Sequence, residues 1–303
     1  RQLNDISVLK AIDTIAPAPA LAIATGDDTY VNAGEATVTL AYTDPQMAVG
    51  DVIQLMLGSA ALGAGYTVTA ADVTAAKVSF TVTKADLGSD GVKSLTAVTT
   101  DTVGNVGTSL PLAVTVDTIA PAGVGIALNA DTGRLNADAK TNDPVANISS
   151  LEPGATFEYQ VDGGAWVAGT ASSFNLTEGA HTYSARQIDA AGNVGNASAA
   201  VSLTLDTTPP ALLASPATAY FVTDLTTLGR GALLQGKGAP ANGSVTITFA
   251  GLDPITVNSD AAGNWALQLP LGITAATTAT LSVTNDVGTA STTATANIDL
   301  TVS

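Results

Sequence analysis

The chain has no cysteine, few aromatic residues and few bases. Without cysteine, disulfides, thiolate zinc sites and thiol redox chemistry are excluded. Aromatic residues are only 4% of a chain that is 46% hydrophobic, so any core must be built from aliphatic side chains. Ten Lys and Arg against 26 Asp and Glu give a formal net charge of −16. This balance argues against nucleic-acid binding, because phosphate contacts need Lys and Arg.

Two further absences concern membranes and catalysis. No run of about 20 apolar residues is present, so we expect no membrane insertion. The only histidine is His181, and it has neither a second histidine nor a cysteine or serine nucleophile motif beside it. The sequence therefore predicts a protein that is not an enzyme. No leader precedes Arg1, so we expect that segments outside this chain direct its export and that it begins within a longer protein.

The acids that are present are almost all aspartate. Only four are glutamate, at positions 35, 152, 158 and 178. Aspartate favours turns, whereas glutamate favours helices, so the negative charge is concentrated in loops. Loops rich in aspartate suit a hard cation such as Ca²⁺, which takes oxygen ligands.

A junction segment recurs at domain-sized intervals. Its copies are Ala11–Pro17 (AIDTIAP), Thr115–Pro121 (TVDTIAP) and Thr204–Pro210 (TLDTTPP). The aspartates at the third position of these copies are Asp13, Asp117 and Asp206, spaced by 104 and 89 residues. Another 93 residues lead to Asp299. Such periods indicate tandem domains rather than a solenoid.

A turn motif recurs near the end of each period. It reads DTVGNVG from Asp101 and DAAGNVG from Asp189, with a degraded copy, NDVGT, from Asn285. Alternating apolar and polar residues flank the first two copies, which is typical of β-hairpins. The chain is thus predicted to be all-β, with three tandem immunoglobulin-like β-sandwich domains in an extended rod. The predicted boundaries are 1–15 for the terminal strand of a preceding module, 16–116 for module 1, 119–205 for module 2 and 208–303 for module 3, a different subtype.

The Asp-Thr-x-x-Pro junction combined with the Asp-x-x-Gly-Asn turn resembles the bacterial Ig-like repeats of giant calcium-dependent adhesins of the RTX and biofilm-associated kind. The resemblance covers nearly the whole chain, although module 1 matches less well outside its two motifs. It implies extender modules that carry an adhesive domain away from the cell, with calcium at the module junctions. It also implies an extracellular location, with retention at the bacterial outer membrane through regions outside this segment.

A metal site can also be argued from topology. In an Ig-like sandwich the first strand starts at the end where the last hairpin turns, so the junction aspartate and the turn of one module should meet. Calcium needs 6–8 oxygen ligands, which carboxylates, carbonyls and waters can supply. The alternative is that both motifs are ordinary turns and linkers. The predicted metal ligands are Asp13, Asp101, Asn105, Asp117, Asp189, Asn193, Asp206 and Asp286, joined at the third junction by Asp131, Asp138 and Asp143.

Three functions compete at this stage. The first is a structural extender of a cell-surface adhesin for attachment or biofilm formation, monomeric, with calcium and the neighbouring modules as its partners. The adhesive ligand, a glycan or a host or bacterial surface, would then bind regions outside this chain. The second is a glycan-binding or protein-binding module, with module 3 as the first candidate. The third is an ancillary region of a secreted enzyme.

Overall fold

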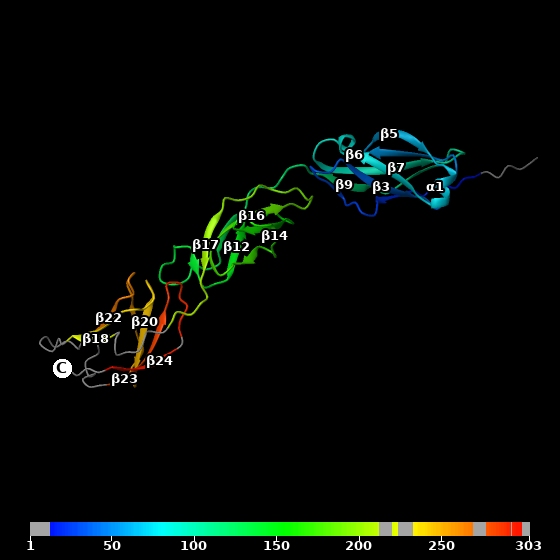
Figure 1. The fold of residues 1–303 in the computed structure, drawn as a ribbon. Coiled ribbons are helices and arrows are strands. Elements are labelled where there is room, and N and C mark those ends of the chain that lie inside the picture. The colour runs from blue at the N-terminus through cyan, green and yellow to red at the C-terminus, as the bar shows by residue number, and fades with distance from the viewer. Residues whose placement is uncertain (1–12, 212–219, 224–232, 269–276, 292, 299–303) are drawn as a thin grey trace, which may run out of the picture. The chain divides into compact units, whose positions relative to one another are not determined.

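A computed structural model describes residues 13–211, 220–223, 233–268, 277–291 and 293–298. The chain divides into two compact units. The first unit is Arg1–Pro121 together with Ile188–Gly195, and the second is Ala122–Gln187 together with Asn196–Ser303. Strands dominate both units (Figure 1). Over the described ranges, no helix is long and apolar enough to cross a membrane.

The first unit contains the two sheets of module 1. One sheet has the strand order β1-β3-β6 and the other β2-β9-β7-β4-β5, with β8 paired to β7. In Figure 1 they are the blue and cyan strands around β3, β6 and β7. The strands are β1 (Ala20–Ile23), β2 (Tyr30–Val31), β3 (Thr37–Thr43), β4 (Val52–Leu57), β5 (Ala60–Thr67), β6 (Val78–Thr83), β7 (Gly91–Thr100), β8 (Val106–Thr108) and β9 (Leu112–Val116).

The core of module 1 follows from alternation along its strands. In β3, residues 38, 40 and 42 are buried while those between them are more exposed. Successive side chains of a strand point to opposite faces, so every second residue enters the core. Leu40 and Tyr42 of β3 pack there with Ile53 of β4 and Leu95 of β7. Tyr42 is the one aromatic side chain among the buried residues of this cluster, and its hydroxyl pairs with Thr99 at 2.7 Å.

Two short helices interrupt module 1, although the chain is predicted to be all-β. They are α1 (Ala70–Ala75) and α2 (Lys84–Leu87). Each begins with a capping box in which a threonine and the aspartate three residues later satisfy each other's backbone N–H groups. The Thr-x-x-Asp signal was present at Thr69 and Thr83, but it is too short to show any helical period.

Module 2 also has two sheets, ordered β10-β12-β15 and β11-β17-β16-β13-β14. Its strands are β10 (Gly125–Leu128), β11 (Lys140–Thr141), β12 (Val145–Ser149), β13 (Thr156–Val161), β14 (Val167–Ala168), β15 (Ser173–Asn175), β16 (Gly179–Ile188) and β17 (Val201–Leu205). Phe157, Phe174 and Tyr183 lie in its core. The strands predicted on either side of the Asp189 turn are β16 and β17, which pair antiparallel.

Module 3 has sheets ordered β18-β19-β22 and β21-β20-β23-β24. Its strands are β18 (Tyr220–Thr223), β19 (Leu233–Gly236), β20 (Ser244–Phe249), β21 (Ile255–Asn258), β22 (Trp265–Gln268), β23 (Thr277–Thr284) and β24 (Ala294–Ile298). Its core includes Val245, Ile247 and Trp265.

Over the described residues the sheets thus form three pairs, each with its own hydrophobic core, and each pair is an immunoglobulin-like β-sandwich. The residue boundaries of the modules remain a prediction. Two short parallel pairings place the junctions: Val31 of β2 lies opposite Val116 of β9, and Thr141 of β11 lies opposite Leu205 of β17. The junction aspartate Asp117 directly follows Val116, and the junction aspartate Asp206 directly follows Leu205.

Candidate functional site

The Asp-x-x-Gly-Asn motif is a closed hydrogen-bonded turn. Oδ1 of Asp101 accepts from the backbone N–H groups of Val103 and Asn105 at 2.9 and 2.8 Å, and its Oδ2 accepts from Nδ2 of Asn105 at 2.7 Å. Burial is the largest influence on the pKa of Asp101 and raises it, but the hydrogen bonds from Asn105, Val103 and Gly104 together lower that pKa below its usual value. The carboxylate is therefore held ionised by its own turn.

The same turn recurs at Asp189 and, in the middle of module 3, at Asp260. Asp189 accepts from the backbone of Ala191 and Asn193 and from the Asn193 amide at 2.9, 2.8 and 2.9 Å. Asp260 receives the same three bonds at the same distances from residues 262 and 264. Because the Asp260 turn is not at a junction, the motif forms on local hydrogen bonds alone.

At the junctions the asparagine of the turn has a second role. Nδ2 of Asn105 donates to the main-chain oxygens of Asp13 and Ile15 at 3.2 and 3.4 Å. Nδ2 of Asn193 donates to the main-chain oxygen of Asp117 at 2.9 Å. The sequence prediction that each junction meets the turn of its own module is consistent with these bonds, which use amides and carbonyls rather than carboxylates.

At the second and third junctions, the threonine after the junction aspartate ties the junction to the preceding module. Thr118 donates its hydroxyl to Asp90 at 2.9 Å, and its N–H donates to the same carboxylate. Thr207 makes the equivalent bonds to Glu178, with its hydroxyl at 2.8 Å. The Thr207 hydroxyl is the largest cause of a lowered pKa at Glu178. Asp90 and Glu178 directly precede Gly91 and Gly179, the first residues of β7 and β16.

An acidic cavity of about 170 Å³ lies at the first junction, within the first unit. It is lined by Asp13 of the junction, Asp101 of the turn and Asp51 of the loop before β4. Asp51 is only 2% exposed; its Oδ2 accepts from the Ala48 N–H at 2.8 Å, and its buried Oδ1 has no hydrogen-bond partner. A buried carboxylate oxygen without a partner carries a large desolvation cost, which a cation in the cavity would remove.

Sequence reasoning missed Asp51 for a structural reason. Its N–H donates to Ala48, and the equivalent loop bond in module 2 runs from Ala155 to Glu152. Asp51 therefore corresponds to Ala155 in module 2, and a search for repeated acids cannot find it. Its only signal is an aspartate directly before an alternating strand segment.

The second junction, at Asp117, also lies within the first unit. Oδ1 of Asp117 accepts from the Ile119 N–H at 3.2 Å. The loop after β2 contacts the Asp189 turn: Nδ2 of Asn32 donates to the Ala191 oxygen at 3.0 Å, and the Ala33 N–H donates to Oδ1 of Asn193 at 2.9 Å. The structure therefore brings Asp117, Asp189 and Asn193 together through the Asn193 amide.

The third junction, at Asp206, keeps this arrangement with different chemistry. Nδ2 of Asn285 donates to Oδ2 of Asp206 at 2.9 Å, and its Oδ1 accepts from the Thr289 N–H at 2.8 Å. The Thr289 hydroxyl donates to the Asp206 main-chain oxygen at 3.0 Å, in the place of the asparagine amides. An amide thus stands beside the junction aspartate where the other junctions have a second carboxylate.

The remaining predicted ligands of the third junction have other partners in the structure. Asp143 closes its own turn: its Oδ1 accepts from the Val145 N–H, and its Oδ2 accepts from the side-chain amide of Asn129. Asp138 and Asp286 face Lys140 at 4.0 and 2.7 Å. Asp131 accepts from the Ala139 N–H through Oδ2 at 3.1 Å, while its buried Oδ1 has no hydrogen-bond partner.

Within the described part of the chain, no three Asp, Glu or His side chains converge closely enough to hold a metal by themselves. A metal at the first junction would therefore need main-chain oxygens and waters beside the carboxylates of Asp13, Asp51 and Asp101. That mixture is ordinary for calcium, which takes 6–8 oxygens of several kinds.

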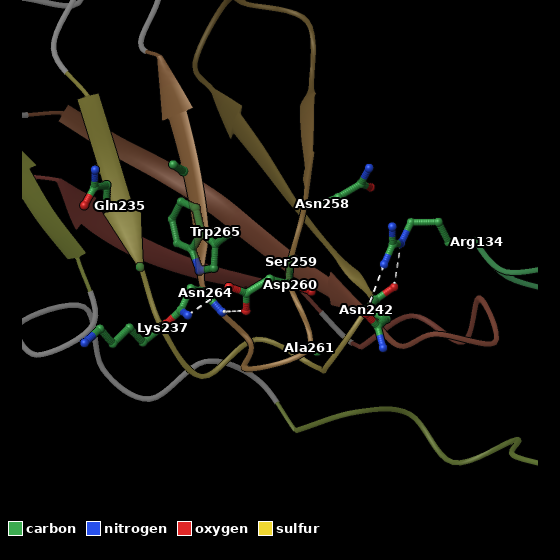
Figure 2. A pocket seen from close by; sticks show the side chains of 12 residues that line it. Arg134, Gln235, Lys237, Asn242, Asn258, Ser259, Asp260, Ala261, Asn264 and Trp265 are labelled. Atoms are coloured by element: carbon green, nitrogen blue, oxygen red, sulfur yellow. Dashed lines mark hydrogen bonds between the residues drawn. The ribbon is translucent and has the colours of Figure 1, made fainter.

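A second cavity, of about 920 Å³, lies in the second unit (Figure 2). Carboxamides of Gln235, Asn242, Asn258 and Asn264 line it, with Arg134 and Lys237 at its edges. The guanidinium of Arg134 donates to the main-chain oxygen and Oδ1 of Asn242 at 2.8 and 3.2 Å, as the dashed lines in Figure 2 show. Trp265 is only 4% exposed, so its ring offers little open face to a ligand.

No family model and no curated protein match the chain. Solved structures match over nearly its full length. A 1.5-MDa bacterial ice-binding adhesin studied for host cell surface retention is 17% identical, with 95% of this chain and 98% of that chain covered at a TM-score of 0.38. A Ca²⁺-stabilized adhesin with which an Antarctic bacterium binds ice is 21% identical, with coverages of 95% and 74% and a TM-score of 0.36. A tetra-tandem repeat from the extending region of a large adhesion protein is 21% identical, with coverages of 95% and 75% and a TM-score of 0.27. Likenesses at this level carry no argument about function.

Proposed function

We propose that this chain is a non-catalytic extender segment of a bacterial cell-surface adhesin, outside the cell, in which Ca²⁺ stiffens module junctions. The segment would project a distal adhesive domain for attachment or biofilm formation. The observation that carries the calcium proposal is the buried, unpartnered Oδ1 of Asp51 in a cavity shared with Asp13 and Asp101. The three carboxylate charges repel one another in the absence of a cation. A divalent ion would remove this repulsion and link the three carboxylates.

The test is calorimetric titration of the full chain with calcium, together with thermal melts. Extracellular calcium modules bind with Kd of about 10⁻⁴–10⁻³ M. If calcium binds only the folded state, a concentration of 100 Kd stabilises by about 2.7 kcal/mol, so melts in calcium and in chelator differ by several degrees.

Asp51→Asn gives the decisive variant. Removing this buried charge should raise the melting temperature in chelator and abolish most of the rise that calcium causes. A variant that merely destabilises the fold would instead lower the melting temperature in chelator. Asp260→Asn is the control for loss of a carboxylate, because Asp260 lies in an exposed turn away from any junction. Superimposable melts of the parent chain with and without calcium would refute the proposal.

A second candidate is ligand binding by module 3, favoured by the amide-lined cavity of Figure 2. Carboxamides both donate and accept hydrogen bonds, as sugar hydroxyl groups require. A glycan array probed with the parent chain and with Asn258→Ala tests it. Binding that is lost in the variant supports a glycan site, and an array without hits counts against one.

A further inference from the structure

Lys140 is the cation of the third junction. Its Nζ donates to Oδ2 of Asp286 at 2.7 Å and lies 4.0 Å from Oδ2 of Asp138. The hydrogen bond to Asp286 is the largest cause of a raised pKa at Lys140, and the charges of Asp138 and Asp206 add to it. An ammonium group thus lies beside Asp138 and Asp286, two of the carboxylates predicted to bind a metal.

The ion pair belongs to a wider contact between the loop after β10 and the last turn of module 3, both within the second unit. The hydroxyl of Thr132 donates to the Val287 oxygen at 2.7 Å, and the Arg134 N–H donates to the Asp286 oxygen at 3.3 Å. The first bond joins a side chain of module 2 to the main chain of module 3, and the second joins the two main chains, so Lys140 reinforces a contact that is already formed.

Comparison with the second junction shows that the lysine is one of three linked differences. The parallel pairings align Lys140 with Tyr30, because Tyr30 lies opposite Thr115 and Lys140 opposite Thr204, each two residues before its junction aspartate. In the turns, Asn285 and Asp286 occupy the places of Asp189 and Ala190. From the second junction to the third, tyrosine is thus replaced by lysine, aspartate by asparagine, and alanine by aspartate.

Together these exchanges change how the carboxylate charges of the third junction are neutralised, compared with those of the second. At the second junction, Asp117 and Asp189 have no ion pair among the described residues, and the nearby Lys84 donates to the main-chain oxygens of Asn32 and Ala33. At the third junction, the Asn285 amide removes one carboxylate and bonds to Asp206, while Lys140 neutralises Asp286. An ammonium in that position also repels a divalent ion.

We propose that the ammonium of Lys140 is the resident cation of the third junction, and that it holds modules 2 and 3 together without a bound metal ion. The chain would then contain junctions of two kinds, with a calcium-dependent one at Asp13 or Asp117 and a calcium-independent one at Asp206. The proposal stands whether or not the other junctions bind calcium.

Spin labels can test each junction separately in the full chain, since it contains no native cysteine. Cysteines at the exposed positions Ala168 and Leu252 span the third junction, and cysteines at Leu110 and Ala168 span the second. The readout is the width of the inter-label distance distribution by pulsed electron spin resonance, measured in calcium and in chelator.

We expect chelator to leave the third-junction distribution unchanged, and Lys140→Met to broaden it equally in calcium and in chelator. Lys140→Met should also speed hydrogen exchange of the Arg134 amide by roughly two- to fivefold, as expected for loss of an exposed ion pair. Lys140→Arg keeps the charge and should behave like the parent. Lys77→Met is the control for loss of a positive charge at an exposed site without an ion pair among the described residues.

Two results would overturn the proposal. One is a third-junction distribution that broadens in chelator while Lys140 is intact, which would mean that a metal, bound for example through the unpartnered Oδ1 of Asp131, holds the modules. The other is an unchanged distribution in Lys140→Met. If chelator fails to broaden the distance distribution across the second junction, calcium stiffening there is refuted. The Lys140 proposal is tested separately, by Lys140→Met and Lys140→Arg.

Discussion

The side-chain amide of Asn193 donates a hydrogen bond of 2.9 Å to the main-chain oxygen of Asp117, which lies 76 residues earlier in the chain. The same Nδ2 donates to Asp189, so both of its N–H donors are used, and its Oδ1 accepts from Ala33. With Asn193 only 5% exposed, these bonds form in a largely dry environment, where hydrogen bonds are stronger. The recurrent asparagine therefore has a structural role that does not require a metal.

Asn193→Ala should destabilise the protein even in chelator. It removes three hydrogen bonds and leaves buried partners unsatisfied, which costs about 1–3 kcal/mol. Asn264→Ala is the matched control, since Asn264 makes the same bonds within its exposed turn but reaches no junction. Denaturant titration should show a clearly larger loss for Asn193→Ala. Equal losses would mean that the link to Asp117 contributes nothing beyond the turn.

Thr118→Val should weaken the attachment of the second junction to module 1. The change keeps the side-chain shape but removes the hydroxyl that donates to Asp90, at a cost of about 0.5–1.5 kcal/mol. Hydrogen exchange of peptides spanning residues 115–121 should become faster, while peptides from β20 serve as an internal reference. Thr207→Val should produce the same local effect around residues 204–210, because Glu178 takes the place of Asp90 there. Unchanged exchange in both variants would show that these threonines do not hold the junctions.

The sequence predicted the flanking strands of both complete turns because alternation continues through β7, β9, β16 and β17. The expectation that each junction aspartate lies near the turn of its own module follows from sandwich topology, and the bonds of Asn105, Asn193 and Asn285 are consistent with it. The hydrogen bonds made by the turn aspartates could not be predicted from the sequence. In the structure, backbone N–H groups of the turn itself donate to the carboxylate oxygens that were predicted to bind a metal. Asp51 escaped detection since its counterpart in module 2 is Ala155. The pairing of Lys140 with Asp286 escaped because only the strand register aligns Lys140 with Tyr30.

The pair of His181 and Asp162 should produce a measurable pH dependence. Nδ1 of His181 lies 2.7 Å from Oδ2 of Asp162, and this bond raises the histidine pKa above 6.5. Hydrogen bonds from the Thr182 backbone and from His181 lower the pKa of Asp162 to about 2. The histidine contribution to stability is thus fully present below pH 6.5 and is lost as pH rises through its raised folded pKa. The aspartate contribution is present above its unfolded pKa of 3.8 and is lost as pH falls through about 2.

Nuclear magnetic resonance can measure the histidine directly, because the chain has only one. Asp162→Asn should bring the pKa of His181 back towards 6.5. Thr182→Val is the control, since it removes a donor to Asp162 without touching the ring, and it should leave the histidine pKa nearly unchanged. A histidine that titrates identically in Asp162→Asn and in the parent would show that the pair is not formed in solution.

Gly133→Ala should disrupt the contact between modules 2 and 3 more than its backbone strain explains. Gly133 has a φ of +95°, and a Cβ there would lie 1.8 Å from the main-chain oxygen of Asp286, which cannot move aside as a flexible side chain could. Gly163→Ala is the matched control: its φ is +70°, but a Cβ there would meet nothing within 4 Å. Strain alone costs on the order of 1 kcal/mol at either position. Denaturant titration should therefore show a larger loss for Gly133→Ala, and hydrogen exchange should accelerate in residues 285–290 in that variant only. Equal losses with unchanged exchange at 285–290 would mean that the loop after β10 does not rest on the Asn285 turn in solution.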